Sequence, residues 1–326
     1  IYMRWYISGH APWSNAYEAI VFIAWVSVLF GLIFSRKNAV ILAGALILAV
    51  LMIVVSEMNL LDPDITPLQP VLKSYWLMIH VAIITGSYGP LGIACILAVL
   101  NLLLYIVRNK RNGQIVTLNI NELTYVAEMT MTIGVFMLTI GTFLGGIWAN
   151  ESWGRYWGWD PKETWALVAV LVYAVILHLR YIPALKNKFT FNVASAWGYS
   201  SILFTFFGVN FYLVGLHSYA QGEGLGEIPQ WIYWTILCFY FMTELASVRN
   251  KLHTLESRKI KISVFLKRAV GLISFLVIFV ILFAYLGLME FGKIIEYGAI
   301  AITVVIGMNL LMFVYSSLVL NRSKSN

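Results

Sequence analysis

The sequence contains few charged residues. Of its 326 residues, only 11% are Asp, Glu, Lys or Arg, whereas 60% are hydrophobic and the mean hydropathy is +0.82. A soluble domain carries about 25% charged residues, so this composition cannot cover a surface that faces water. Soluble globular, disordered and collagen-like classes are therefore excluded, and an all-α polytopic integral membrane protein remains.

Cysteine is also scarce. The two cysteines, Cys95 and Cys238, each stand inside an apolar run. A lone thiol in such a run is typical of a small buried hydrophobic residue and not of a reactive group. The absence of a CxxC motif argues against a thioredoxin-like redox pair and against a structural zinc site. The first residue is Ile1 and no signal-peptide pattern precedes it, so we expect the sequence to begin inside a longer chain.

Nine apolar runs are long enough to cross about 30 Å of hydrocarbon as helices, which takes about 20 residues each. They are 17–34, 39–56, 75–106, 123–147, 165–182, 193–217, 229–247, 264–288 and 295–319. Ser35–Asn38 joins the first two, which fits a helical hairpin. Gly89–Pro90 predicts a kink in the third. The proline-rich segment 57–74 is predicted to be an irregular crossover.

The basic residues give these runs an orientation. Threading the runs alternately through a membrane places most of the 22 lysines and arginines on one side, which the positive-inside rule assigns to the cytoplasm. The net charge of +7 then acts as an insertion signal, and a nucleic-acid function is disfavoured. The segment 148–164, between the fourth and fifth helices, falls on the outer face together with the loops 57–74 and 218–228.

Tryptophan is abundant and concentrated. Of the 12 tryptophans, Trp148, Trp153, Trp157, Trp159 and Trp165 fall within 18 residues. An aromatic belt at the membrane interface explains any one of them, but it explains neither their density nor the polar residues between them. Those polar residues are Arg155, Asp160, Lys162 and Glu163. Indole planes beside such groups suit a large, flat, partly charged ligand, whose carboxylates Arg and Lys would meet.

The end of this segment predicts the start of a helix. Asp160 fits the N-cap, Pro161 the first helical position and Glu163 the third, which is the pattern of a capping box. Such a cap would hold the end of the tryptophan segment rigidly on the next helix.

Two histidines are predicted at the depth of this segment. His80 lies five residues inside the outer end of the third apolar run, and His217 lies at the outer end of the sixth. The alternative for either one is a hydrogen-bonded packing residue. Two histidines at one depth, beside the tryptophan-rich segment, favour paired axial ligands of a haem iron.

The other titratable residues are less specific. His178 stands about 20 Å deeper, at 1.5 Å per helical residue, where it could be interfacial or could ligate a second haem. We expect His10 and His253 to be solvated. Glu128 and Glu244 could be transport carboxylates, but we expect them to face protein or the cytoplasmic boundary.

The sequence from Trp153 to Trp165, WGRYWGWDPKETW, resembles the tryptophan-rich WWD signature of haem-handling proteins in cytochrome c maturation. Its DPKETW ending, followed by Tyr173 and by His178-Leu-Arg180, is similar to the CcsA (ResC) branch of the system II cytochrome c synthase. The stretches 208–219 and 4–18 agree with that branch. The resemblance covers about residues 1–220, so we divide the chain into a CcsA-like domain at 1–228 and additional helices of open role at 229–326.

The resemblance implies a site and a reaction. His80 and His217 match the two external histidines that ligate haem, and His178 matches a transmembrane histidine proposed to hold haem during its outward passage. The second ligand of that inner haem has no match in this chain. The residues expected to bind haem are His80, His217, His178, Trp153, Arg155, Tyr156, Trp157, Trp159, Asp160, Lys162, Glu163 and Trp165.

The implied activity is that of a holocytochrome c synthase, which attaches haem b through thioether bonds to the CxxCH motif of apocytochrome c. The implied partner is a CcsB (ResB) protein or a fused domain of that kind, as in a CcsBA fusion. The expected location is a bacterial inner membrane or a thylakoid-type membrane, with the WWD segment on the periplasmic or outer face. No catalytic residue is expected beyond those that position haem. The alternatives are a haem exporter without ligation activity and a secondary transporter unrelated to haem.

Overall fold

The structure is a computed structural model that describes residues 1–254 except 59–60, 66–67, 69–71, 214 and 218–228. These residues form helices and connecting segments, and none of the described residues is in a strand. The chain divides into two units. The first comprises residues 1–107 and 111–229, and the second comprises 108–110 and the residues from 230 onward.

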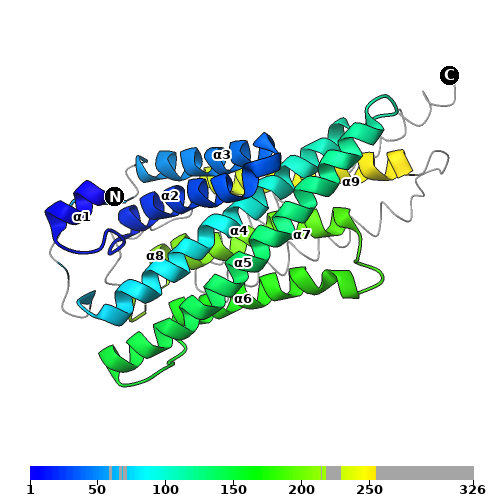
Figure 1. Ribbon diagram of the computed structural model, residues 1–326. Coiled ribbons are helices and arrows are strands. Elements are labelled where there is room, and N and C mark those ends of the chain that lie inside the picture. Colours follow the sequence, from blue (N-terminus) through cyan, green and yellow to red (C-terminus); the bar gives the residue numbers. More distant parts are fainter. Residues whose placement is uncertain (59–60, 66–67, 69–71, 214, 218–228, 255–326) are drawn as a thin grey trace. The chain divides into compact units, whose positions relative to one another are not determined.

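The first unit is a helix bundle that includes one 3₁₀ turn at each of two helix ends and one π-helical turn (Figure 1). Its elements are α1 (Tyr2–Ser8), α2 (Ala16–Phe34), η1 (Ser35–Lys37), α3 (Ala39–Ser56), α4 (Tyr75–Val107), α5 (Gly113–Trp153), α6 (Pro161–His178), η3 (Leu179–Tyr181), α7 (Lys188–Leu203), η4 (Phe204–Gly208) and α8 (Val209–Tyr212). The second unit contributes α9 (Gln230–Thr254).

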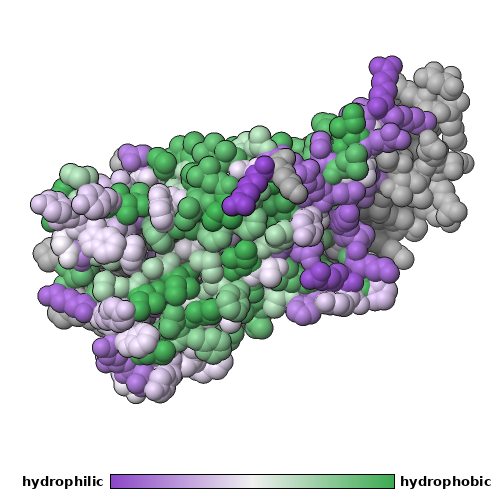
Figure 2. Space-filling view, viewed as in Figure 1, coloured by the Kyte–Doolittle hydropathy of each residue, from purple (hydrophilic) through white to green (hydrophobic). Residues whose placement is uncertain are grey.

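Six helices in the described part of the chain are long and apolar enough to cross a membrane. They are α2, α3, α4, α5, the stretch from α6 through η3, and α9. They correspond to six of the nine predicted runs. The predicted runs 264–288 and 295–319 lie outside the described residues. Figure 2 shows hydrophobic side chains gathered over the middle of the helices on the face drawn.

The predicted run 193–217 is wrong at its outer end. α7, η4 and α8 follow one another from residue 188 to 212, but helical structure stops at Tyr212. Leu213 turns to extended backbone, with φ −117° and ψ 136°. His217 therefore lies in a turn beyond the helix and not on its last turn, because the chain leaves the helix axis before reaching it.

The predicted hairpin and crossover are present. Asn15 caps α2 by accepting a hydrogen bond from the backbone of Glu18 at 2.8 Å, and Asn38 caps α3 in the same way from Val40 at 2.9 Å. α2 and α3 pack side by side (Figure 1). The described residues of 57–74 are irregular apart from short turns, and α4 runs through Pro90 as one continuous helix.

The tightest packing joins α4 to α5. An added Cβ would stand 2.6 Å from Leu91 at Gly134, 2.9 Å from Ile84 at Gly141 and 2.6 Å from His80 at Gly145. Gly141 and Gly145 form the small-xxx-small pattern that lets helix backbones approach closely in membranes. This close approach of the two helices sets the position of His80, whose ring lies against Gly145.

Candidate functional site

A cavity opens at the end of the bundle where α5 ends and α6 begins. Its walls come from the segment before α2, from the first turns of α4, from the end of α5 and the following loop, from the start of α6, and from η4, α8 and the turn beyond. Lining residues important for its chemistry are Trp13, Ser14, His80, Tyr88, Trp148, Tyr156, Trp157, Lys162, Glu163, Asn210 and His217. The cavity thus brings together residues separated by more than 200 positions of sequence.

His80 is held on one wall by a backbone acceptor. Its Nδ1 lies 2.7 Å from the carbonyl oxygen of Gly141, and its ring rests against Gly145. A carbonyl oxygen can only accept, so Nδ1 donates the proton and the lone pair of the neutral ring is on Nε2. This is the tautomer that a metal-ligating histidine uses, with its other nitrogen oriented by an acceptor.

His217 is held in the same way by a carboxylate. Its Nδ1 lies 2.7 Å from Oδ2 of Asp160, a residue that is only 6% exposed. Asp160 also accepts hydrogen bonds from the backbone N–H of Leu216 at 2.6 Å and of Lys162 at 3.1 Å. Burial raises the pKa of Asp160, but the hydrogen bonds from His217 and from these backbone groups outweigh it and hold the pKa below its ordinary value. Asp160 is therefore an anion that fixes the imidazole.

Both histidines contact one buried indole. The ring of Trp148, 1% exposed, is stacked on His80 at 6.2 Å between centroids and 11° between planes. The same indole meets His217 at 5.5 Å, and Trp153 meets His217 at 5.3 Å. The two imidazoles predicted at one depth thus share a cavity and one neighbour, which fixes their mutual geometry.

The predicted capping box is confirmed. Asp160 is the N-cap of α6, Pro161 follows it, and the Glu163 carboxylate accepts hydrogen bonds from the backbone of Asp160 at 3.2 Å and of Gly158 at 2.8 Å. The tail of the tryptophan segment is therefore rigidly attached to α6.

The remaining tryptophan-segment residues divide between the cavity and its surroundings. Tyr156 and Trp157 line the cavity. Trp159 is 71% exposed, meets Trp157 at 5.9 Å, and has φ 58°, in the left-handed region. Trp165 packs on Phe204 at 4.2 Å and does not line the cavity. The segment is therefore not one flat surface: three of its rings, Trp148, Tyr156 and Trp157, line the cavity, and the others lie around it.

The two predicted cations have different environments. Lys162 lines the cavity, where its Nζ donates a hydrogen bond to Oδ1 of Asn210. Arg155 does not line the cavity; its guanidinium pairs with Glu163 at 3.4 Å and lies 5.9 Å from the Trp153 ring.

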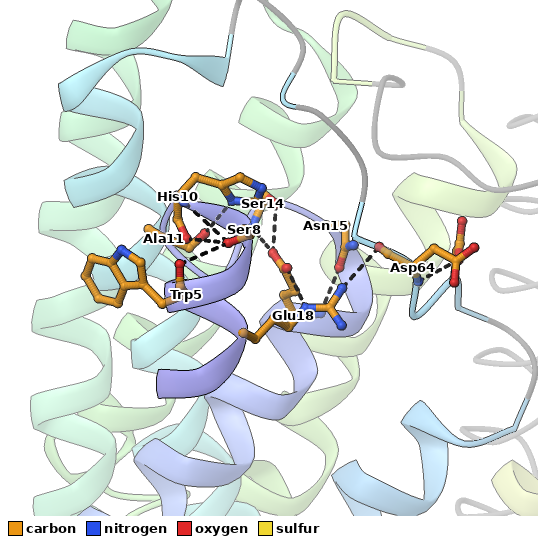
Figure 3. A network of polar contacts seen from close by, with 10 residues as sticks. Trp5, Ser8, His10, Ala11, Ser14, Asn15, Glu18 and Asp64 are labelled. Atoms are coloured by element: carbon orange, nitrogen blue, oxygen red, sulfur yellow. Dashed lines mark hydrogen bonds and ion pairs between the residues drawn. The ribbon is translucent and has the colours of Figure 1, made fainter.

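A polar network joins α1 and the segment before α2 to the first turn of α2 (Figure 3). The Glu18 carboxylate, 2% exposed, accepts hydrogen bonds from Nε of Arg4 at 2.6 Å and from the backbone and hydroxyl of Ser14 at 2.8 and 2.7 Å. Trp13 donates from its indole to the carbonyl of Met78 at 3.2 Å. These contacts place Trp13 and Ser14 in the cavity wall.

His10 is not solvated as predicted. Its Nδ1 lies 3.3 Å from the carbonyl of Ala11, and its buried Nε2 has no hydrogen-bond partner among the described residues. The ring borders a second hollow that shares Trp13, Ser14 and Leu72 with the first. His253 lies in α9, at a position whose side chain is outside the described part.

His178 lies apart from the cavity, at the far end of α6. Its ring is exposed, and its Nδ1 lies 2.6 Å from the carbonyl of Ala174. Nearby, Glu128 forms an ion pair with Arg180 at 2.6 Å, which confirms that this carboxylate faces protein. Among the described residues, no group of three or more His, Cys, Asp or Glu is placed to hold a metal ion.

Sequence reasoning missed several residues of the site. The GxxxG spacing of Gly141 and Gly145 was visible and predicts close helix packing, but it does not reveal that His80 lies in that contact. Asn210 and Trp13 lie in the stretches 208–219 and 4–18 that resemble the family, but neither was predicted to line the site. Trp148 belonged to the tryptophan-rich segment, yet its contact with both histidines depends on the fold.

The chain is similar to known proteins over about two thirds of its length. Residues 13–217 match the family model described as cytochrome C assembly protein. The chain is 46% identical over 223 residues to protein NrfI of Wolinella succinogenes, covering 68% of this chain and 25% of that protein. It is 36% identical over 238 residues to cytochrome c biogenesis protein CcsA of Guillardia theta, covering 66% of this chain and 79% of that one. For CcsA of Chlamydomonas reinhardtii the identity is 37% over 225 residues, with 67% and 63% covered.

Proposed function

The chain belongs to the cytochrome c assembly protein family, and from this membership we propose that it binds haem b between His80 and His217. The region of the chain that matches the family model contains every residue that lines the cavity. It would present that haem for thioether attachment to the CxxCH motif of apocytochrome c. Haem is the cargo and substrate of this reaction and not a resident cofactor. The match spans only a quarter of NrfI, so further parts of the machinery would come from other domains or chains.

One observation carries the proposal. Each histidine has its Nδ1 engaged by an oriented acceptor, the Gly141 carbonyl for His80 and the Asp160 carboxylate for His217. In both rings Nε2 is then the ligating nitrogen. Two such rings that line one cavity suit an iron with two axial imidazoles, and the surrounding aromatic groups suit a porphyrin plane.

The chemistry requires positioning more than acid–base catalysis. Each cysteine thiol of the acceptor adds across one vinyl group of haem, so that an S–C bond forms and the thiol proton is transferred to the vinyl group's other carbon. No net oxidation occurs. Holding the iron by two imidazoles fixes the ring relative to the entering thiols. The acceptor's own histidine can then replace one of the two and release the product.

An inner haem site belongs to the same proposal. His178 stands at the opposite end of α6 from Asp160 and would hold haem before its outward passage. Its second ligand would come from outside the described residues or from a partner of the CcsB (ResB) kind. The cavity end of the bundle would face the periplasm or the equivalent outer compartment, in a nine-helix topology that includes 264–288 and 295–319.

The experiment is a spectrum of the purified chain in detergent with added haem. His80→Ala and His217→Ala should each lose the bis-histidine Soret signature, and each should regain it with exogenous imidazole. His10→Ala is the matched control, because His10 is an outer histidine that does not line this cavity. A double variant of His80 and His217 that keeps the wild-type spectrum would refute the site.

A second assay separates synthase from haem delivery. The chain, with the partner if one is required, is given haem and a reduced CxxCH peptide, and the thioether product is measured by mass. Formation of the product supports ligation, whereas bound haem without product supports delivery alone. A chain that binds no haem in either assay would favour the transporter alternative.

A further inference from the structure

We propose that Lys162 and Asn210 form a carboxylate site that binds a haem propionate and so sets which edge of the porphyrin faces the acceptor. This inference rests on the proposed haem site and adds the direction in which haem lies within it. The two residues come from the first turn of α6 and from α8, and both line the cavity that contains His80 and His217.

Lys162 is a cation without a carboxylate at ion-pair distance in the described part of the chain. Its Nζ donates to Oδ1 of Asn210, which is 9% exposed, and lies 5.8 Å from the ring of Phe206. Of the described residues lining the cavity, Lys162 is the only lysine or arginine. A charge held among apolar rings is costly unless an opposite charge accompanies it, so this position favours an anionic ligand.

The neighbouring carboxylates are engaged elsewhere. Asp160 accepts from His217 and from two backbone N–H groups. Glu163 accepts from the backbone of Gly158 and Asp160 and pairs with Arg155. Arg155 therefore already has an anionic partner, Glu163, whereas among the described residues the ammonium of Lys162 meets a neutral amide and the Phe206 ring, with no carboxylate at ion-pair distance. The charge imbalance selects Lys162, not Arg155, as the group that meets a ligand carboxylate.

The location of Lys162 gives the bound porphyrin a direction. α2 packs on α4, α4 on α5 and α5 on α6, and Figure 1 shows α2 and α6 on opposite sides of α4 and α5. In haem b the propionates and the vinyl groups occupy opposite halves of the ring. Propionates held at the α6 wall therefore direct the vinyl edge toward the wall made by Trp13 and Ser14, next to the hollow beneath the segment before α2.

The test compares haem with haem dimethyl ester, in which both propionates are esterified while the iron and the vinyl groups are kept. Wild-type protein in detergent should bind haem about ten-fold or more tightly than the ester by Soret titration, because a charge-assisted contact to a buried lysine is lost in the ester. Lys162→Met should bind haem as weakly as the ester while its affinity for the ester stays unchanged. Lys162→Arg should keep the preference.

The control is a second lysine–asparagine pair at the other end of the bundle. Lys188 donates to Oδ1 of Asn121 at 2.7 Å, far from the cavity, so Lys188→Met should keep the full preference for haem. Unchanged ester binding by Lys162→Met also shows that this variant is folded.

The outcomes separate the two proposals. If the wild type binds haem and ester equally well with bis-histidine spectra, or if Lys162→Met weakens both ligands equally, the propionate contact is refuted and the haem site stands. If the wild type gives a bis-histidine spectrum with neither porphyrin, the proposed function itself fails.

Discussion

The Nδ1 atom of His217 lies 2.7 Å from Oδ2 of Asp160, and the same carboxylate is the N-cap of α6. One buried side chain therefore couples the start of a helix to the orientation of a candidate iron ligand 57 residues later. The tryptophan segment ends at this carboxylate, so its fold and the position of the ligand are set together.

Asp160→Asn should separate these two roles. Asparagine caps a helix about as well as aspartate, so α6 should keep its start and the protein should lose only about 1 kcal/mol from the weaker bond to His217. Haem affinity should fall about 10–100-fold, as is typical when the group orienting a ligating histidine is changed. Soret titration measures the affinity and circular dichroism the helix content. An Asp160→Asn variant with wild-type haem affinity would show that the carboxylate does not orient the ligand.

The same carboxylate predicts a pH dependence. The pKa of Asp160 lies below its ordinary value of 3.8 in the folded chain. Its stabilising contribution is therefore complete above about that value and is lost as the pH falls through the lower folded pKa. The melting temperature of the wild type should exceed that of Asp160→Asn at pH 7, and the difference should shrink as the pH is lowered below 3.8 and through the folded pKa of Asp160. A constant difference across this range would contradict the sign.

Part of this site could be predicted from the sequence because it is local. The capping box at Asp160 depends on four consecutive residues, and it forms as predicted. That His80 and His217 lie near one level follows from run lengths, and both do line one cavity. The bond between Asp160 and His217 could not be predicted, since it requires the chain to leave α8 at Tyr212 and turn back. His10 was predicted to be solvated but is partly buried, with its Nε2 covered, beside a hollow that is also lined by residues between 65 and 81.

Gly145→Ala should displace His80. An added Cβ would stand 2.6 Å from Cε1 and 3.0 Å from Nδ1 of the imidazole, closer than real contacts allow. Alanine favours the helix by about 1 kcal/mol, but overpacking of this kind costs about 1–3 kcal/mol, and the ring bears most of the shift. The Soret band should weaken or change to a single-histidine form.

Gly86→Ala is the matched control for Gly145→Ala. It changes a helical glycine on α4 whose added Cβ would meet only side-chain ends, Met137 at 3.4 Å and Phe22 at 3.7 Å. Its haem spectrum should match that of the wild type. If both variants bind haem normally, the placement of His80 against Gly145 does not matter for ligation.

Trp159→Gly should uncouple stability from function in the tryptophan segment. Trp159 has φ 58°, a conformation that costs an L-residue about 1–2 kcal/mol and that glycine adopts freely. Its side chain is 71% exposed, so the substitution removes little beyond the edge contact with Trp157. The melting temperature should therefore stay the same or rise.

Strain of this kind is retained where the residue serves a function, and the exposed indole beside the cavity is placed to meet the porphyrin or the acceptor. Transfer of haem to a CxxCH peptide should fall several-fold, whereas Trp25→Ala, which removes an exposed indole from α2, should transfer haem normally. A Trp159→Gly variant that melts much earlier than the wild type would show that this backbone conformation is stabilising instead of strained.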